Sequence, residues 1–213
     1  MRDQYYEELD HIVDELVQLT GTVRRAVSDA TIALLEADGP VAEKVIEGDK
    51  AVVEKAEAIE ERALLILATQ QPVATDLRQL IATLRMLADL QRMGALSVHV
   101  AKIARRRMPE VAVPASLHPT IVAMAKVADS MIDSASSIVA SRDVAAAMRL
   151  EEEDDEMDRL RKDLFRSLLG DEWEHGVESA VDIALLGRYY ERIGDHAVSM
   201  ARRVVYLVTG QMT

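Results

Sequence analysis

The prolines of this 213-residue chain are few and unevenly placed, and this limits the possible folds more than any other feature. Three of the five lie within eleven residues, at Pro109, Pro114 and Pro119, whereas Pro40 and Pro72 stand alone. Proline inside a helix removes a hydrogen bond and clashes with the preceding turn, so each marks an interruption between helices. The long stretches between these interruptions are free to be helical.

Apolar residues recur every three or four positions between these prolines, as they do on one face of a helix. The clearest run is a series of leucines at Leu77, Leu80, Leu84, Leu87 and Leu90. The tripeptide Asp38-Gly39-Pro40 is typical of one helix ending and the next beginning. We therefore predict six helices, at about residues 3–37, 40–69, 73–107, 118–141, 143–169 and 172–209.

The two halves of the chain resemble each other in sequence. Residues 92–106 match residues 192–206, with arginine, glycine, valine and alanine recurring at positions 100 residues apart. Upstream an offset of 105 aligns Asp49 with Asp154. Because the matches are sparse, chance similarity is the alternative. We interpret them as two copies of a three-helix unit.

Composition agrees with an all-α fold, since only 3% of the residues are aromatic and the chain holds nine glycines and five prolines. A sheet protein needs more turn residues and more strand-forming aromatic residues. Long helices joined by short turns pack antiparallel. We predict two tandem three-helix bundles, residues 1–107 and 118–213, joined by a linker at residues 108–117.

Charge and cysteine content exclude several classes of function. The chain has no cysteine, which excludes disulfides and thiolate chemistry and suits a reducing cytoplasm. Its net charge of −12 argues against nucleic-acid binding. The charged first residues do not resemble a signal peptide, and the longest apolar run, residues 63–69, is shorter than the roughly 20 residues of a membrane span. We expect a cytoplasmic protein that meets a membrane only through partners.

Two pairs of acidic residues have the spacing of metal ligands. Glu191 and Asp195 are four residues apart and lie on one face of a helix, and Asp154 and Asp158 repeat this spacing on the helix before it. Four carboxylates on adjacent helices can form the cage seen in di-metal bundles, and they suit iron or hard divalent cations. The sequence therefore suggests a metal site in the second bundle.

A purely structural interpretation remains open for each pair. Six consecutive acidic residues at 151–156 are also typical of a solvated helix face, and Arg188 and Arg192 can neutralise Glu191. Gly194 in a long helix costs about 1 kcal/mol relative to alanine, which indicates the close approach of a neighbouring helix or a ligand. His196 points about 100° away from Asp195 around the helix, so at best it would support a ligand.

The first half lacks the equivalent acids. Asp49 is accompanied by Val53, and Gln91 by Ala95. Because Asp49 is the only charged ligand left among these four positions, we expect that a metal site in the first bundle has been lost. No nucleophile motif, phosphate-binding loop or Glu-x-x-His ligand pair is present. We predict no enzyme activity, with a carboxylate-bridged di-metal oxidase or metal-storage protein as the alternative.

Several segments together resemble the PhoU family. They are the acidic stretch at 154–158, ERIGDHAVSMA at 191–201, its partial twin DLQRMGALSVHVAKIA at 89–104, and QQPVATDLRQL at 70–80. The segments DLQRMGA and HVAKIARR are similar in sequence to the corresponding segments of actinobacterial PhoU-type proteins.

This resemblance implies two bundles related by a pseudo-twofold axis and a cytoplasmic adaptor rather than an enzyme. The adaptor would couple the ATPase subunit of a phosphate ABC transporter to a sensor histidine kinase and repress the starvation response when phosphate is plentiful. The resemblance also implies metal binding, here by Asp154, Asp158, Glu191 and Asp195. The long apolar helix faces further predict a homo-oligomer, which we expect to be a dimer.

Overall fold

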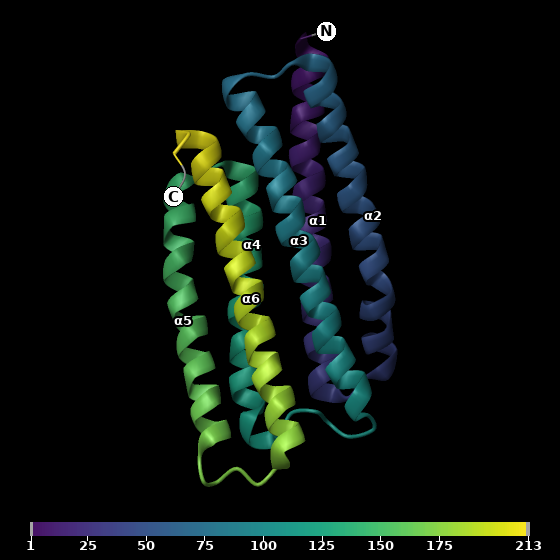
Figure 1. The fold of residues 1–213 in the computed structure, drawn as a ribbon, viewed down its shortest axis with the longest axis vertical. Helices are drawn as coiled ribbons and strands as arrows, with labels where there is room; N and C mark the ends of the chain where they lie inside the picture. The colour runs from purple at the N-terminus through teal and green to yellow at the C-terminus, as the bar shows by residue number, and fades with distance from the viewer. Residues whose placement is uncertain (1, 212–213) are drawn as a thin grey trace.

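The computed structural model describes residues 2–211, with side chains from Tyr5 onward, and this part of the chain is helical and contains no strand. It forms six long α-helices and one short 3₁₀-helix (Figure 1). The elements are α1 (Arg2–Glu36), α2 (Gly39–Gln70), α3 (Ala74–Arg107), η1 (Ala115–Leu117), α4 (His118–Ser141), α5 (Val144–Leu169) and α6 (Gly176–Thr209). The predicted all-α fold of two tandem three-helix bundles is confirmed.

Local capping explains where the helices end and begin. After α1 the backbone of Ala37 turns into the left-handed region with φ of 53°. The Asp38 side chain then accepts a hydrogen bond from the Val41 N–H at 2.9 Å, and Pro40 lies in the first turn of α2. The predicted helix break at Asp38-Gly39-Pro40 is thus confirmed, because the cap satisfies an N–H group that the new helix cannot pair itself.

One predicted helix start was wrong. The sixth helix begins at Gly176, four residues later than expected from the sequence. The Trp173 backbone N–H donates to the Gly170 carbonyl at 3.2 Å, and its indole N–H donates to the Gly176 carbonyl at 2.9 Å. These bonds hold residues 170–175 in a loop, although they contain no proline.

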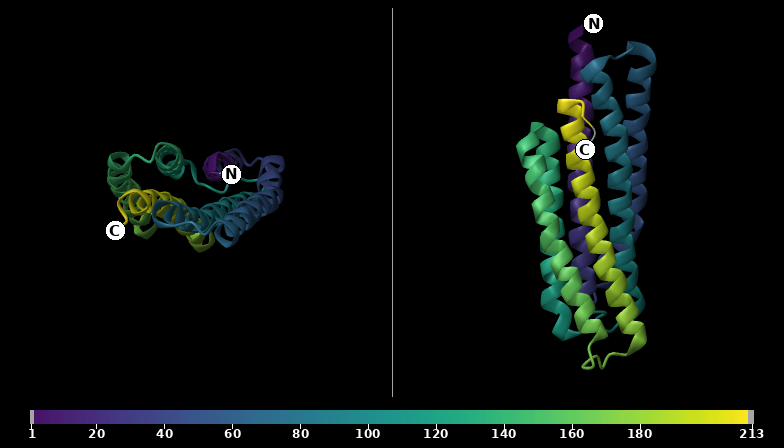
Figure 2. Two further views of the ribbon diagram at one scale, coloured as in Figure 1. Left: turned by 90° about the horizontal axis from the view of Figure 1, so that it is seen from above. Right: turned by 60° about the vertical axis from the view of Figure 1, so that its left-hand side comes forward.

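The six helices form two layers. Seen from above, α3 and α6 lie side by side along one long face, α1 and α4 lie along the other, and α2 and α5 lie at the two ends (Figure 2). The bundles meet where α3 packs on α6 and α1 packs on α4. Buried apolar residues of both bundles belong to a single continuous core. The segment between Arg107 and His118 joins the bundles.

Contacts between α3 and α6 show the twofold relation of the two halves. At one end of this antiparallel pair the Arg78 guanidinium donates to the Leu207 carbonyl at 3.1 Å. At the other end Arg107 pairs with Glu178 at 3.1 Å. The two contacts are equivalent under the offset of 100 residues, because position 78 corresponds to position 178 and position 107 corresponds to position 207. The offset in the sequence is therefore the symmetry of the fold.

Buried carboxylates strengthen this contact between the bundles. Asp182, whose side chain is 2% exposed, pairs with Arg106 and with Arg107 at 2.5 Å. Asp89, also buried, contacts His196 at 3.0 Å and Arg203 at 3.3 Å. Buried charges are stable only when they are paired, so α3 and α6 depend on each other for these partners.

Within residues 2–211, no helix combines the length and the apolar character that crossing a membrane requires.

Candidate metal centre

The candidate site lies where α5 packs against α6. The N-terminus of α5 is capped by Asp143, whose side chain accepts a hydrogen bond from the Ala146 N–H at 2.9 Å. Leu150, Met157 and Leu164 on this helix are buried in the core. Asp154 and Asp158 lie between these positions in the sequence, and Asp154 is turned toward α6.

Two glycines on α6 let neighbouring helices approach closely. A Cβ atom at Gly187 would lie 2.7 Å from the Cδ2 atom of Leu164 on α5. At Gly194 it would lie 3.1 Å from the sulfur of Met131 on α4 and 3.5 Å from Oδ1 of Asp154. The close approach predicted at Gly194 is confirmed, because a helix neighbour and a carboxylate both occupy the space beside it.

The four predicted acids share one electrostatic environment. Partial burial raises the pKa of Asp154 above its ordinary value, and the negative charges of Asp195, Asp158 and Glu191 raise this pKa further. Desolvation and like charges both disfavour an ionised carboxylate. The i, i+4 spacing on two adjacent helices has therefore gathered negative charge around Asp154, and a bound cation would relieve this repulsion.

The same side chains also have partners that compete with a metal. Buried Glu191 is paired with Arg188 on its own helix and with Arg161 on α5 at 3.3 Å. Asp158 faces Lys162 at 3.9 Å. The sequence suggested Arg188 and Arg192 as neutralising partners of Glu191. Arg188 has this role, whereas Arg192 forms no ion pair with any carboxylate of residues 5–211. The second partner is Arg161, which the sequence analysis did not foresee.

This arrangement fits a metal in the type of its donors but not in their present geometry. The carboxylate oxygens are ligands suited to hard cations. Yet among residues 5–211 no three histidine, aspartate or glutamate side chains are grouped closely enough to hold a metal ion. The side chains of Glu191 and Asp158 would have to leave their basic partners before a cation could be shared.

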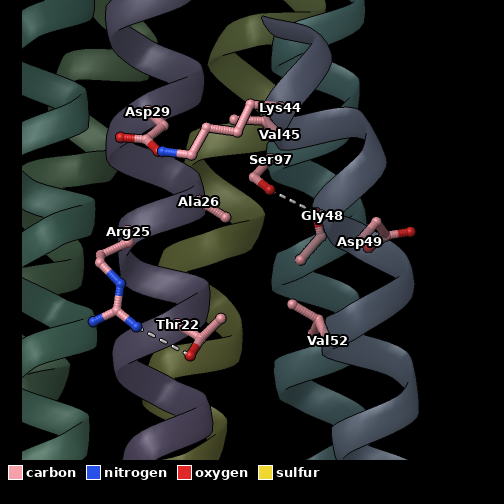
Figure 3. Close-up of a pocket in the computed structure, with 11 residues that line it drawn as sticks. Thr22, Arg25, Ala26, Asp29, Lys44, Val45, Gly48, Asp49, Val52 and Ser97 are labelled. Atoms are coloured by element: carbon pink, nitrogen blue, oxygen red, sulfur yellow. Dashed lines mark hydrogen bonds and ion pairs between the residues drawn. The ribbon is translucent and has the colours of Figure 1, made fainter. Parts of the chain in front are cut away.

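The equivalent place in the first bundle is an open pocket (Figure 3). Oδ1 of Asp49 lies 3.5 Å from the Cβ position of Gly94, the same relation that Asp154 has to Gly194. The pocket has a volume of about 180 Å³ and is lined by residues of α1, α2 and α3. Lys44 extends from α2 to Asp29 on α1, at 2.9 Å. The two halves thus keep one shared aspartate position while their surroundings differ.

His196 does not belong to the acidic site. Its Nδ1 lies 3.0 Å from Oδ1 of Asp89 on α3, and the Ser199 hydroxyl donates to Oδ2 of Asp89 at 3.2 Å. Arg203 completes the group of partners around this carboxylate. His196, Ser199 and Arg203 have the i, i+3, i+7 spacing of one helix face, and this pattern could have indicated a shared partner on another helix.

Fold and site together define a double three-helix-bundle protein with an acidic cluster in its second bundle. A family model described as the PhoU domain matches residues 16–104 and 121–204. The chain belongs to the PhoU family.

Relatives match over nearly the whole chain. The chain is 45% identical over 210 residues to the phosphate-specific transport system accessory protein PhoU homolog 2 of Mycobacterium tuberculosis, covering 99% of both chains. It is 43% identical to PhoU homolog 1 of Mycobacterium leprae, covering 99% of this chain and 95% of that protein.

Solved structures agree with the fold. The crystal structure of PhoU from Pseudomonas aeruginosa superposes with a TM-score of 0.88 at 29% identity, covering 97% of this chain and 100% of that one. The phosphate transport system regulatory protein PhoU from Streptococcus pneumoniae has a TM-score of 0.86 at 23% identity, covering 98% of this chain and 99% of that one, which speaks for the fold alone.

Proposed function

We propose that this protein is a cytoplasmic regulator of a phosphate-specific transport system. The observation that carries the proposal is the 45% identity, over 99% of both chains, to a protein named as an accessory of such a system. The buried carboxylates Asp89 and Asp182 are paired with basic side chains across the contact between the bundles. These pairs have a structural role, and the proposal assigns them no part in a reaction. The long helices present extended faces of the kind that partner proteins bind.

In mechanism the protein acts as an adaptor between two partners. It contacts the ATPase subunit of the phosphate ABC transporter and a sensor histidine kinase, and it keeps the starvation response repressed while phosphate is plentiful. It performs no catalysis of its own. Regulation by contact requires that the affinity for one partner depend on the state of the other, since coupling between sites is reciprocal.

Deletion of the gene tests this proposal. In phosphate-rich medium the deletion strain should express a phosphate-starvation reporter that the parent strain keeps silent, and the wild-type gene should restore silence. A strain that lacks the sensor kinase as well should remain silent. Unchanged repression in the single deletion would refute the regulatory role.

A second part of the proposal concerns metal. We propose that Asp154, Asp158, Glu191 and Asp195 bind a divalent cation or iron when Arg161 and Arg188 release the glutamate. The raised pKa of Asp154 supports this, because burial and then the negative charges of Asp195, Asp158 and Glu191 disfavour its ionised form, and a bound cation would stabilise that form. A bound cation would hold α5 against α6 and would present a different acidic surface to a partner.

Metal analysis and thermal unfolding test this second part. Wild-type protein should retain metal after purification without chelators and should unfold at a higher temperature with added Mn²⁺. Asp154→Asn should abolish both effects, whereas Asp49→Asn, the matched position in the first bundle, should preserve them. At a cation concentration about 100 times the dissociation constant, the expected stabilisation is about 2.7 kcal/mol. Equal responses of all three proteins would contradict metal binding at this site.

The alternative of a di-metal oxidase finds little support in the second bundle. Such proteins carry a Glu-x-x-His ligand motif on two of their four helices and a single glutamate ligand on each of the other two. His196 is engaged with Asp89 on α3 instead.

A further inference from the structure

The outer side of α5 carries a line of exposed residues whose charges are sorted by sign. Buried Ala147, Leu150, Met157 and Leu164 mark the side of this helix that faces the core. Seven exposed residues lie on the side turned away from the core, at alternating spacings of four and three, which keeps them in one line along the helix. We call them the α5 stripe, and they are Met148, Glu152, Asp155, Arg159, Lys162, Arg166 and Leu169.

Charge and polarity change in a fixed order along the α5 stripe. Its two acids lie in the N-terminal half, its three bases follow from position 159 onward, and its apolar residues stand at the two ends. Met148 is 66% exposed and Leu169 is 82% exposed, so neither side chain contributes to the core. When the stripe is turned end for end, acids face bases and apolar residues face apolar residues. The stripe is therefore complementary to itself everywhere except at its centre.

The stability of the helix does not explain this order. Like charges three or four residues apart on a helix repel, as Glu152 and Asp155 do and as Lys162 and Arg166 do. The helix dipole favours acids in the first turn and bases in the last turn, but its effect fades beyond those turns. Within α5 the first turn has no acid, and Arg166 is the one base of the last turn. The order of the charges therefore has no sufficient cause within α5.

The acids and the lysine of the α5 stripe are available to a partner. The ion pairs along α5 leave Glu152 and Asp155 without a basic partner among residues 5–211. Lys162 forms a long ion pair with Asp158, at 3.9 Å. These three charges are therefore largely uncompensated in the single chain.

The two arginines of the α5 stripe share one acid. Asp163 lies 2.7 Å from Arg166 and 3.3 Å from Arg159, and its single charge cannot neutralise both. Arg159 is also paired with Glu156, at 2.8 Å. Arg166 is 79% exposed and lacks such a second partner among residues 5–211, so part of its charge is free for a carboxylate of another molecule.

The matching residues of α2 show that the repeat does not require this pattern. The offset of 105 residues between the halves places Glu57 at the position of Lys162 and Glu61 at the position of Arg166. Two such stripes of α2 would repel each other, because five of the seven matching residues are glutamates. These residues are all exposed, and they are Glu43, Glu47, Lys50, Glu54, Glu57, Glu61 and Leu64. The self-complementary order is thus a property of α5 and not of the three-helix unit.

We propose that the α5 stripe is the contact surface of a homodimer, in which the α5 helices of two copies of this chain lie antiparallel across a twofold axis. A twofold contact brings the same surface of both copies together, so it requires a surface that complements itself. With the axis near Arg159, Glu152 faces Arg166 of the second copy, and Asp155 faces Lys162 of the second copy. The symmetry forms each of these pairs twice.

The ends and the centre of the α5 stripe fit the same register. Met148 faces Leu169 of the second copy at both ends of the contact, which removes these apolar side chains from water. At the centre the two Arg159 side chains are each neutralised by Glu156 of their own helix. A second copy can reach this surface because α5 lies at one end of the two layers and packs on α4 and α6 with its inner side (Figure 2).

The dimer goes beyond the proposed function, and neither depends on the other. The sequence predicted a dimer from long apolar helix faces, but it gave no contact surface. A contact between one pair of helices is smaller than the roughly 1,600 Å² of a standard interface, so we expect a dissociation constant on the order of 10–100 µM.

The test uses two double variants whose stripes each carry one sign of charge at the paired positions. The acidic variant is Lys162→Glu with Arg166→Glu. The basic variant is Glu152→Lys with Asp155→Lys. All four side chains are exposed, and circular dichroism should show that both variants are folded.

Each variant has a control on α2 with the same change of net charge. Lys50→Glu with Lys55→Glu matches the acidic variant, and Glu57→Lys with Glu61→Lys matches the basic variant. These four side chains are also exposed. The controls show how much of any effect comes from the net charge of the whole protein.

Sedimentation equilibrium over protein concentrations that span the expected dissociation constant measures the dimer. Wild type and both controls should dimerise. Each stripe variant alone should dimerise about tenfold or more weakly, because like charges then face each other. An equimolar mixture of the acidic and basic variants should form a heterodimer about as tightly as wild type forms its dimer, since every charged pair of the contact is then complementary again.

A second measurement does not depend on charge. The chain has no cysteine, so Arg159→Cys places a single thiol at the proposed axis. A short bismaleimide should join two copies of this variant. The same reagent should not join copies of Lys55→Cys, whose thiol is exposed on α2.

Each outcome decides the proposal. If wild type stays monomeric throughout the concentration range, the proposal is overturned. If wild type dimerises and the stripe variants dimerise as their controls do, the contact lies elsewhere on the molecule and the α5 surface is refuted. If the mixture of variants forms no heterodimer, the antiparallel register is refuted. The starvation reporter in the deletion strain is a separate measurement, so any of these failures leaves the proposed function standing.

Discussion

Removal of the Asp182 carboxylate should destabilise the protein more than removal of an exposed acid between the same two bundles. Asp182 lies on α6 with its side chain 2% exposed and pairs with Arg106 and Arg107 of α3. Breaking a fully buried ion pair by deleting one partner costs about 3–5 kcal/mol, because the other charge stays buried without compensation.

The cost here is reduced by the exposure of the two arginines. Arg106 is 58% exposed and can turn into water, whereas Arg107 is 23% exposed and has less freedom to do so. We therefore expect Asp182→Ala to lower the free energy of unfolding by about 2–3 kcal/mol. In a chain of this length that corresponds to a decrease in melting temperature of about 5–10 °C.

Urea unfolding at neutral pH, followed by circular dichroism, measures this loss. The matched control is Asp133→Ala, because Asp133 pairs with Arg24 between α1 and α4 but is 58% exposed. The control should lose less than about 1 kcal/mol. Adding Arg107→Ala to Asp182→Ala should recover part of the loss, since no charge then stays buried. Similar small losses at Asp182 and Asp133 would refute the reasoning that burial decides the strength of these pairs.

Three further changes have expected outcomes that unfolding measurements can check. Without metal, Asp154→Asn should stabilise the protein by about 0.5 kcal/mol at pH 7, because it removes like-charge repulsion. Since the pKa of Asp154 is raised in the folded protein, this gain should fade as the pH decreases toward the ordinary value of 3.8, and a gain that persisted at that pH would contradict the prediction. Gly187→Ala should destabilise the protein by about 1–2 kcal/mol, because its Cβ would meet buried Leu164, whereas Gly48→Ala, with open space around it, should stabilise the protein by about 0.5–1 kcal/mol. Equal effects of the two substitutions would show that packing does not distinguish the two glycines. Asp38→Ala should cost about 1 kcal/mol by removing the cap of α2, and an unchanged melting temperature would show that the cap is dispensable.

The helices could be predicted because their signals are local. Capping groups such as Asp38 and the cluster of prolines at 109–119 act on the nearest turn of backbone, and the apolar period identifies the buried face wherever the helix packs. The start of α6 was missed for a matching reason. The loop before it contains no proline and depends on hydrogen bonds of Trp173, and it ends at Gly176, whose φ is 75° and which the sequence prediction had placed inside the helix.

The candidate site could be predicted only in part. The four-residue spacing of each acidic pair places both members on one helix face, and the adjacency of α5 and α6 follows from the three-helix unit. Whether Glu191 meets a cation of the solvent or an arginine depends on the side chains that α5 brings opposite it. Arg161 lies 30 positions before Glu191, and its reach across the helix contact has no signature in the spacing of either helix.

The sequence alone determined the six helices, their grouping into two bundles and the repeat of a three-helix unit, because helix period, caps and breakers work over a few residues. Only the tertiary structure decided which charges meet across the bundles. It paired Asp89 with His196 and Asp182 with Arg107, and it left Arg85, Arg92 and Lys102 of α3 exposed and without an ion pair to any carboxylate of residues 5–211. Such pairings join residues 75 to 107 positions apart in the chain, and their energies depend on burial and orientation that exist only once the helices have packed.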